Sequence, residues 1–140
     1  MSKAYDLGKD LGKAITSGIS KLRFLPGGDD YDALIDFPYQ YFMAYEPSDD
    51  MILRGKVRRV GREKWCAQSD LRLTNPPSVD VGWKLFRDSG EYDYMREEYC
   101  LKGFPRRYNG KLYVVIADRV DDATPPPNNP QSWQEMVEAV

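Results

Sequence analysis

A chain of 140 residues with 41% hydrophobic and 30% charged residues has a globular composition rather than a disordered or fibrous one. This length allows one domain with a hydrophobic core plus tails and excludes two ordinary domains. The formal net charge is −2, and histidine, the commonest general base and metal ligand, is absent. No phosphate-binding loop, dinucleotide fingerprint or nucleophile elbow occurs. We therefore expect a protein that is not an enzyme and that has no cofactor and no metal site.

The small number of cysteines and the hydropathy of the sequence predict where in the cell the protein resides. Cys66 and Cys100 are too few for a disulfide framework and lack metal-ligand spacing, which is typical of thiols in a reducing environment. Residues 1–22 have dispersed lysines and no apolar core of the length that a signal peptide needs. No window approaches the run of about 18 apolar residues that crosses a bilayer. We expect a cytoplasmic protein with no transmembrane segment.

Charge is segregated along the chain. The formal charge is +3 over residues 1–23, −7 over 24–50, +6 over 51–119 and −4 over 120–140. Within the basic middle, residues 54–64 hold six cations and one acid. If these cations share a face with the basic residues near position 106, they form a stripe that suits a phosphate backbone. The alternative is that the cations are dispersed over the solvent side of a small sheet and offset by nearby acids.

The first half of the chain predicts a helical arm and an acidic segment. Residues 1–24 place apolar residues at three- and four-residue steps, which is the period of an amphipathic helix. This helix can pack on its own domain, on another protein or on a membrane surface. Residues 25–50 are acidic and aromatic, and we expect them to pack on the domain as a short helix or a strand pair.

Residues 51–86 alternate in the manner of β-strands. The segment 51–60 reads as a strand with Gly55 inside it, where an interior glycine often marks a bulge. Residues 64–73 and 79–86 also alternate apolar and polar side chains. Residues 88–98 are interpreted as a short helix.

The segment 99–120 predicts a β-hairpin. Asn109 and Gly110 form the dipeptide that a two-residue type I′ turn favours, because both central residues need a positive φ. The hairpin carries four cations and no acid before Asp118, and Tyr108 and Tyr113 flank the turn. Cations beside aromatic rings suit a single strand of nucleic acid, although a stable, soluble hairpin has the same composition.

Residues 123–140 predict a tether. Residues 123–130 are a stiff, proline-rich spacer that is not expected to join a sheet, and residues 132–140 place apolar side chains at helical spacing. The alternative is a C-terminal helix that folds back on the domain.

Five strands with a helix-sized insert, a glycine in the first strand and the final hairpin CLKGFPRRYNGKLYVVIADRV resemble the OB-fold, an oligonucleotide-binding barrel. The resemblance covers residues 50–120 and implies a mainly β fold with flanking helices: a small five-stranded barrel over residues 51–122, an N-terminal amphipathic helix and a proline-rich C-terminal tail. It also implies that ligands cross the second and third strands and two loops. Trp65 and Trp83 are possible stacking residues, but they lie on the predicted apolar faces and are more simply interpreted as core. The tail resembles that of bacterial single-stranded-DNA-binding proteins but lacks their dense acidic run and aromatic tip.

Two functional hypotheses follow. The first is a non-catalytic protein that holds single-stranded DNA or RNA on a basic and aromatic face. Its predicted nucleic-acid site consists of Arg58, Arg59, Arg62, Lys64, Arg106, Arg107, Tyr108, Lys111 and Tyr113. The second is a protein-interaction or assembly subunit, such as a phage or secretion-system accessory protein or an immunity-type inhibitor. Its predicted partner-binding residues in the two terminal segments are Leu7, Leu11, Ile15, Trp133 and Met136.

Overall fold

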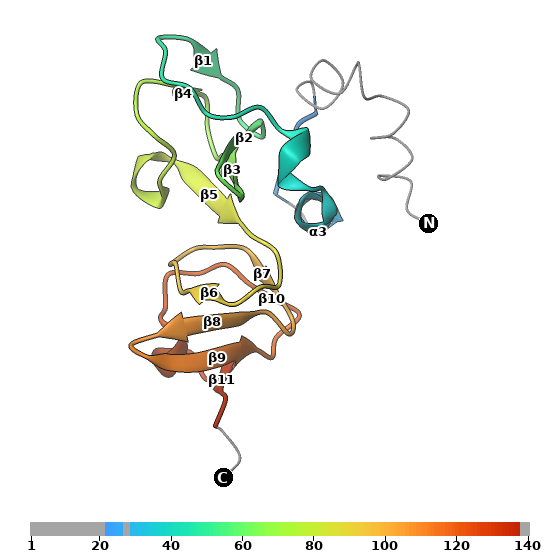
Figure 1. Ribbon diagram of the computed structural model, residues 1–140, viewed down its shortest axis with the longest axis vertical. Helices are drawn as coiled ribbons and strands as arrows, with labels where there is room; N and C mark the ends of the chain where they lie inside the picture. The colour runs from blue at the N-terminus through green and yellow to red at the C-terminus, as the bar shows by residue number, and fades with distance from the viewer. Residues whose placement is uncertain (1–21, 27–28, 138–140) are drawn as a thin grey trace. The chain divides into compact units, whose positions relative to one another are not determined.

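Residues 22–26 and 29–137, which the computed structural model describes, contain eleven short strands in four small sheets and one α-helix (Figure 1). The prediction of a mainly β chain is confirmed. The chain divides into two units, Met1–Lys84 and Leu85–Val140, where the sequence had led us to expect one domain. Among the described residues no helix is long and apolar enough to cross a membrane.

The first unit combines a helix with two small sheets. Helix α3 spans Asp29–Asp36, and a 3₁₀ turn follows at Tyr39–Tyr41. Strands β2 (Val57–Val60), β3 (Glu63–Ala67) and β5 (Trp83–Phe86) form one sheet in that order, in which β2 and β3 pair antiparallel, and a 3₁₀ turn at Val79–Val81 precedes β5. Strands β1 (Met51–Ile52) and β4 (Leu71–Arg72) pair antiparallel in a second sheet.

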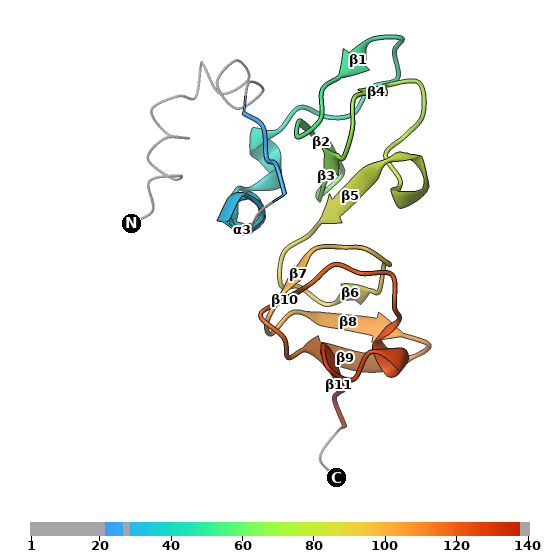
Figure 2. The ribbon, with the colours of Figure 1, turned by 180° about the vertical axis from the view of Figure 1, so that it is seen from behind.

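The second unit has a larger sheet and a short strand pair. Its four-stranded sheet has the order β11 (Trp133–Glu135), β9 (Lys111–Val115), β8 (Pro105–Tyr108) and β6 (Tyr92–Asp93). Strands β7 (Cys100–Leu101) and β10 (Arg119–Val120) pair antiparallel. A 3₁₀ turn at Pro126–Asn128 precedes β11, and Figure 2 shows β8, β9 and β11 side by side from behind.

The predicted hairpin is confirmed in detail. Asn109 has φ +50° and Gly110 has φ +78°, both in the left-handed region that a type I′ turn requires. The turn connects β8 to β9, and Tyr108 pairs with Lys111 across it. Local turn chemistry therefore sets the register of this hairpin.

The two units contain an internal repeat whose equivalent residues lie 48 positions apart, as Val57 and Pro105 do at the starts of β2 and β8. The strand pair β1·β4 corresponds to β7·β10, and the hairpin β2·β3 corresponds to β8·β9. Gly55 and Gly103 have φ +87° and +91°, a conformation that favours glycine. We call residues 44–84 the first repeat and residues 92–136 the second repeat. The residues identical at equivalent positions include Leu53 and Leu101, Gly55 and Gly103, Arg58 and Arg106, Arg59 and Arg107, and Asp70 and Asp118.

Backbone hydrogen bonds repeat as well, with a spacing of 48 residues in the hairpin and of 50 residues at the start of the third strand. Gly55 N–H donates to Ala67 O at 2.8 Å, and Gly103 N–H donates to Val115 O at 2.9 Å. Gln68 N–H donates to Gly82 O at 2.9 Å, and its equivalent, Ile116 N–H, donates to Ser132 O at 2.8 Å. A buried tryptophan opens the third strand of each repeat, Trp83 in β5 and Trp133 in β11. The two repeats therefore share the order of their strands, the pairing of their hairpins and a buried tryptophan at the start of the third strand.

Several expectations about the elements were wrong. The strands of residues 51–122 belong to two units and four sheets, so a single five-stranded barrel over this range is not found among the described residues. Gly55 lies in a turn between β1 and β2 rather than inside one strand, and residues 88–98 contain β6 and turns rather than a helix. The proposed tether joins the sheet instead, because Trp133–Glu135 pairs with β9. Within residues 25–50, for which a short helix and a strand pair were both considered, the described part contains helix α3 and a 3₁₀ turn.

Candidate docking face of the second repeat

Three of the predicted nucleic-acid contacts are buried side chains, which is a correction to that prediction. Lys64 is 3% exposed, Arg106 is 0% exposed and Tyr113 is 7% exposed. A phosphate or a base cannot reach these groups without unfolding the unit around them. The sequence pattern places Lys64 and Arg106 on the surface because lysine and arginine are rarely fully buried unless they are paired.

Arg106 is held in a buried ion cluster. Its Nε donates to Glu98 Oε1 at 2.9 Å and its Nη2 donates to Glu98 Oε2 at 2.7 Å. Arg87 also donates to both Glu98 oxygens, at 2.8 and 3.1 Å. The Arg106 guanidinium also donates to three backbone carbonyls, those of Asp88, Gly90 and Pro105. Burial by itself would lower the pKa of Arg106, but the hydrogen bonds and the charge of Glu98 outweigh it and raise that pKa.

Lys64 holds the end of helix α3. Its Nζ donates to Ile35 O at 2.9 Å, to Phe37 O at 2.6 Å and also to Leu34 O. The last carbonyls of a helix have no partner inside the helix, and a cation there also interacts favourably with the helix dipole. This lysine therefore ties α3 to β3 and is part of the structure of the first unit.

The other predicted contacts differ in exposure and partners. Arg62 is exposed in the β2–β3 turn, and Arg58 and Arg59 are half-buried. Arg58 donates only to Val57 O, at 3.0 Å, and its burial lowers its pKa. In the second repeat, Arg107 pairs with Glu91, and Lys111 lies 3.9 Å from Glu135. Tyr108 is half-buried with its ring edge-on to Tyr94, at a centroid distance of 5.6 Å.

The predicted partner-binding residues fall into three groups: outside the described residues, buried and exposed. Leu7, Leu11 and Ile15 lie outside the described residues. Trp133 is 3% exposed and packs against Tyr94 at a centroid distance of 5.9 Å, so its prediction as an accessible contact was wrong. Met136 is 50% exposed, as a contact residue must be.

One face of the first repeat is covered by the segment before it. We call this face, formed by the side chains of Arg59, Lys64, Cys66 and Gln68, the outer face of the first repeat. Arg59 Nε donates to Phe42 O at 3.0 Å, and the Cys66 thiol donates to Phe24 O at 3.4 Å. Tyr31 of α3 donates through its hydroxyl to Gln68 Oε1 at 3.1 Å. With the Lys64 bonds, every side chain of this face has a partner in residues 24–42. Tyr31 and Leu34 of α3 are buried.

The equivalent face of the second repeat is largely apolar, and none of the described residues covers it as α3 covers the first repeat. We call it the outer face of the second repeat; it includes Arg107, Leu112, Val114, Ile116 and Met136, and Gln134 lies beside Val114 on β11. Arg107 pairs with Leu112 across β8 and β9, and Met136 N–H donates to Leu112 O at 2.7 Å, so these side chains form one row across three strands. Leu112 and Val114 are half-buried, and Ile116 is 40% exposed.

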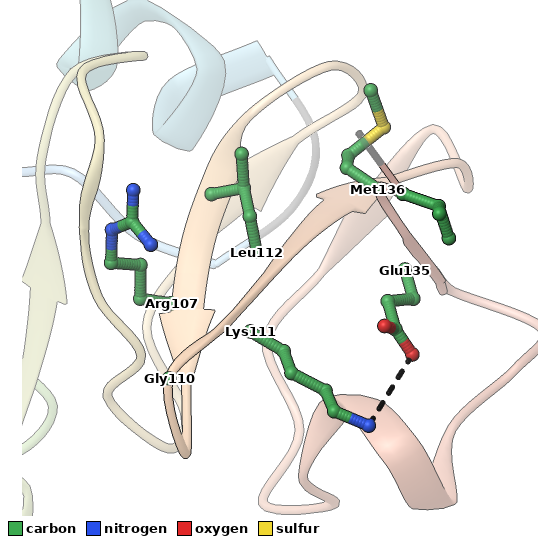
Figure 3. A pocket seen from close by; sticks show the side chains of 7 residues that line it. Arg107, Gly110, Lys111, Leu112, Glu135 and Met136 are labelled. Carbon is green, nitrogen blue, oxygen red and sulfur yellow. Dashed lines mark ion pairs between the residues drawn. The ribbon is translucent and has the colours of Figure 1, made fainter. Parts of the chain in front are cut away.

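A hollow lies at one end of this face. It has a volume of about 440 Å³ and is lined by Arg107, Gly110, Lys111, Leu112, Glu135, Met136 and Val137. Figure 3 shows Lys111 and Glu135 facing each other at its rim, beside the side chains of Leu112 and Met136. Apolar side chains surrounded by charges of both signs are typical of a protein contact surface.

Sequence reasoning missed this face because it did not compare the two halves of the chain. The signal was available: residues 53–59 and 101–107 read LRGKVRR and LKGFPRR. At the equivalent positions of β3 and β9, Lys64, Cys66 and Gln68 become Leu112, Val114 and Ile116. Among the described residues no group of three possible metal ligands occurs. No protein-family model and no curated protein matches this sequence.

Proposed function

We propose that this chain is a non-catalytic protein-interaction module that binds a partner protein on the outer face of the second repeat. The proposal rests on one observation: the same face of the same repeat is covered by residues 24–42 in one unit and open in the other. Covering three half-exposed aliphatic side chains removes apolar surface from water, which stabilises a complex by about 25 cal/mol per Å².

The charges around this face support a protein partner more than a polyanion. Arg107 is paired with Glu91, Lys111 lies near Glu135, and Arg106 is buried with Glu98. The net attraction of the hairpin for phosphates is therefore smaller than its four cations suggest, since a nucleic acid would have to displace carboxylates. A protein surface can satisfy the same cations with one or two acids and place apolar side chains between them.

The experiment is site-specific photo-crosslinking followed by titration. A photoreactive residue at position 116 is expected to crosslink a protein in the source cell, whereas the same residue at the exposed position 60 of the first repeat is not. The captured protein, produced separately, is then titrated against the wild-type chain and against Val114→Lys. Saturable binding that Val114→Lys weakens by at least about tenfold supports the proposal, as roughly 1.4 kcal/mol of contact energy would be lost. Equal binding to both forms would refute it.

Nucleic-acid binding by the first unit is the second candidate. Arg62 is exposed in the β2–β3 turn, and Arg58 and Arg59 lie on the preceding strand without an ion pair among the described residues. Fluorescence anisotropy of a labelled single-stranded oligonucleotide at about 50 and about 200 mM salt tests it, since phosphate contacts give a steep salt dependence. Arg62→Glu must then abolish binding, and Arg106→Glu cannot serve as the test because Arg106 is buried.

A further inference from the structure

We propose that the partner segment that occupies the outer face of the second repeat is an amphipathic α-helix of about three turns. This inference rests on the proposed function and adds the chemistry of the partner. Its basis is that the first repeat already carries its own occupant, helix α3, on the equivalent face.

The cover of the first repeat supplies the template. Helix α3 has eight residues and buries Tyr31 and Leu34, which are one helical turn apart. Its C-terminal carbonyls accept hydrogen bonds from Lys64 near the start of β3, and Tyr31 donates to Gln68 just beyond the end of β3. A helix thus lies along the positions that are equivalent to Leu112 and Ile116.

The dimensions of the open face fit a helix. Leu112 and Ile116 are four residues apart on an extended strand, a span of about 13 Å at roughly 3.3 Å per residue. A helix rises about 1.5 Å per residue, so about nine residues, or two to three turns, cover this span. Side chains at steps of three and four along such a helix form one apolar stripe, which matches the single row of aliphatic side chains on β9.

The substitutions between the repeats define the partner's sequence. The Lys64 ammonium group donates hydrogen bonds to the backbone carbonyls at the end of α3, whereas the side chain of its equivalent, Leu112, has no hydrogen-bond donor. The helix on the second repeat must therefore continue past Leu112 with apolar side chains instead of ending there. Arg107 is equivalent to Arg59, which donates to the Phe42 carbonyl. An acidic side chain of the partner helix is expected next to Arg107, where it competes with Glu91 for the guanidinium group.

The experiment uses two displayed libraries against the full-length chain. One library randomises the surface of a helix within a folded helical scaffold, and the other displays unstructured linear peptides. Selected binders are titrated against wild type, Val114→Lys and the matched control Val60→Lys, which changes an exposed valine of the first repeat. Amide hydrogen exchange verifies that each variant is folded.

Four results separate the inference from the proposed function. Helical binders with an apolar stripe that lose at least about tenfold in affinity on Val114→Lys, but not on Val60→Lys, support both, and a proline in the centre of such a helix must abolish binding. Binders that come only from the linear library and depend on Val114 overturn the helical inference and leave the proposed function standing. No binder that depends on Val114 in either library overturns both. Concentration-dependent dimerisation that Val114→Lys removes would identify a second copy of this chain as the occupant and overturn the helical inference.

Discussion

Replacing Glu98 by glutamine should destabilise the second unit by about 3 to 5 kcal/mol, the cost of breaking a buried ion pair. The Glu98 side chain is 1% exposed and accepts four hydrogen bonds, two from Arg87 and two from Arg106. Glutamine has nearly the same shape but turns one oxygen into an NH₂ donor, so it loses the negative charge and two of the four hydrogen bonds, one from each guanidinium group. Two buried cations are then left without a carboxylate at this position, which low-polarity surroundings penalise.

Amide hydrogen exchange measures this effect unit by unit. A loss of 3 to 5 kcal/mol raises exchange of amides in β8 and β9 by roughly two to four orders of magnitude. Glu97→Gln is the matched control, because Glu97 is 41% exposed and its pair with Arg96 contributes about 0 to 1 kcal/mol. Amides of β2 and β3 report on the first unit in the same sample. If Glu98→Gln accelerates exchange in β8 and β9 by less than about tenfold, the assignment of Glu98 as the anion that compensates Arg87 and Arg106 is wrong.

Three further changes test other parts of the structure. Lys64→Met removes three bonds to the carbonyls at the end of α3 and should cost about 2 to 3 kcal/mol, measured as faster amide exchange in α3; unchanged exchange would contradict a capping role. Gly55→Ala and Gly103→Ala both place a side chain at positive φ, which costs about 1 kcal/mol each. Only the methyl group at position 55 also contacts Leu25 and the backbone of Phe24, so urea unfolding should show a larger loss of stability for Gly55→Ala. Burial raises the pKa of the Cys66 thiol to about 12 and also raises that of Cys100, whereas unfolded thiols ionise near about 8.5. Below about pH 8.5 the thiols are neutral in both states and the folded state keeps its full stability; above it the unfolded thiols ionise, and the free energy of unfolding falls by about 1.4 kcal/mol per pH unit for each cysteine. A Cys66→Ala and Cys100→Ala double variant should therefore lose less stability than wild type between pH 8 and 10.

The elements that could be predicted from the sequence are those set by local chemistry. Asn109 and Gly110 determine a turn by their tolerance of positive φ, and the structure has that turn with the expected pairing. The alternation of residues 64–73 likewise predicted β structure, which begins with β3. Each of these signals lies within a few residues of the element that it predicts.

The burial of Lys64 and Arg106 could not be predicted in the same way. The partners of Lys64 are backbone carbonyls about thirty residues earlier in the chain. The partner of Arg106 is the carboxylate of Glu98, which precedes β7 in the sequence. Composition and spacing count a lysine or an arginine as a surface cation, and only the tertiary fold shows which of them has a fixed internal partner. The same limit explains Trp133, which lies in a segment rich in proline yet joins the sheet through β9.

The divergence of the two repeats is itself informative about function. Equivalent core positions keep their character: Trp65 and Tyr113 are both buried, as are Ala67 and Val115. The outer-face positions change instead, from polar side chains bonded to residues 24–42 to aliphatic side chains that are partly exposed. A face that had simply lost its cover would be expected to become polar, because exposed aliphatic side chains promote aggregation. Aliphatic residues at Leu112, Val114 and Ile116 are instead consistent with a face that is covered part of the time, by a partner that comes from outside the repeat.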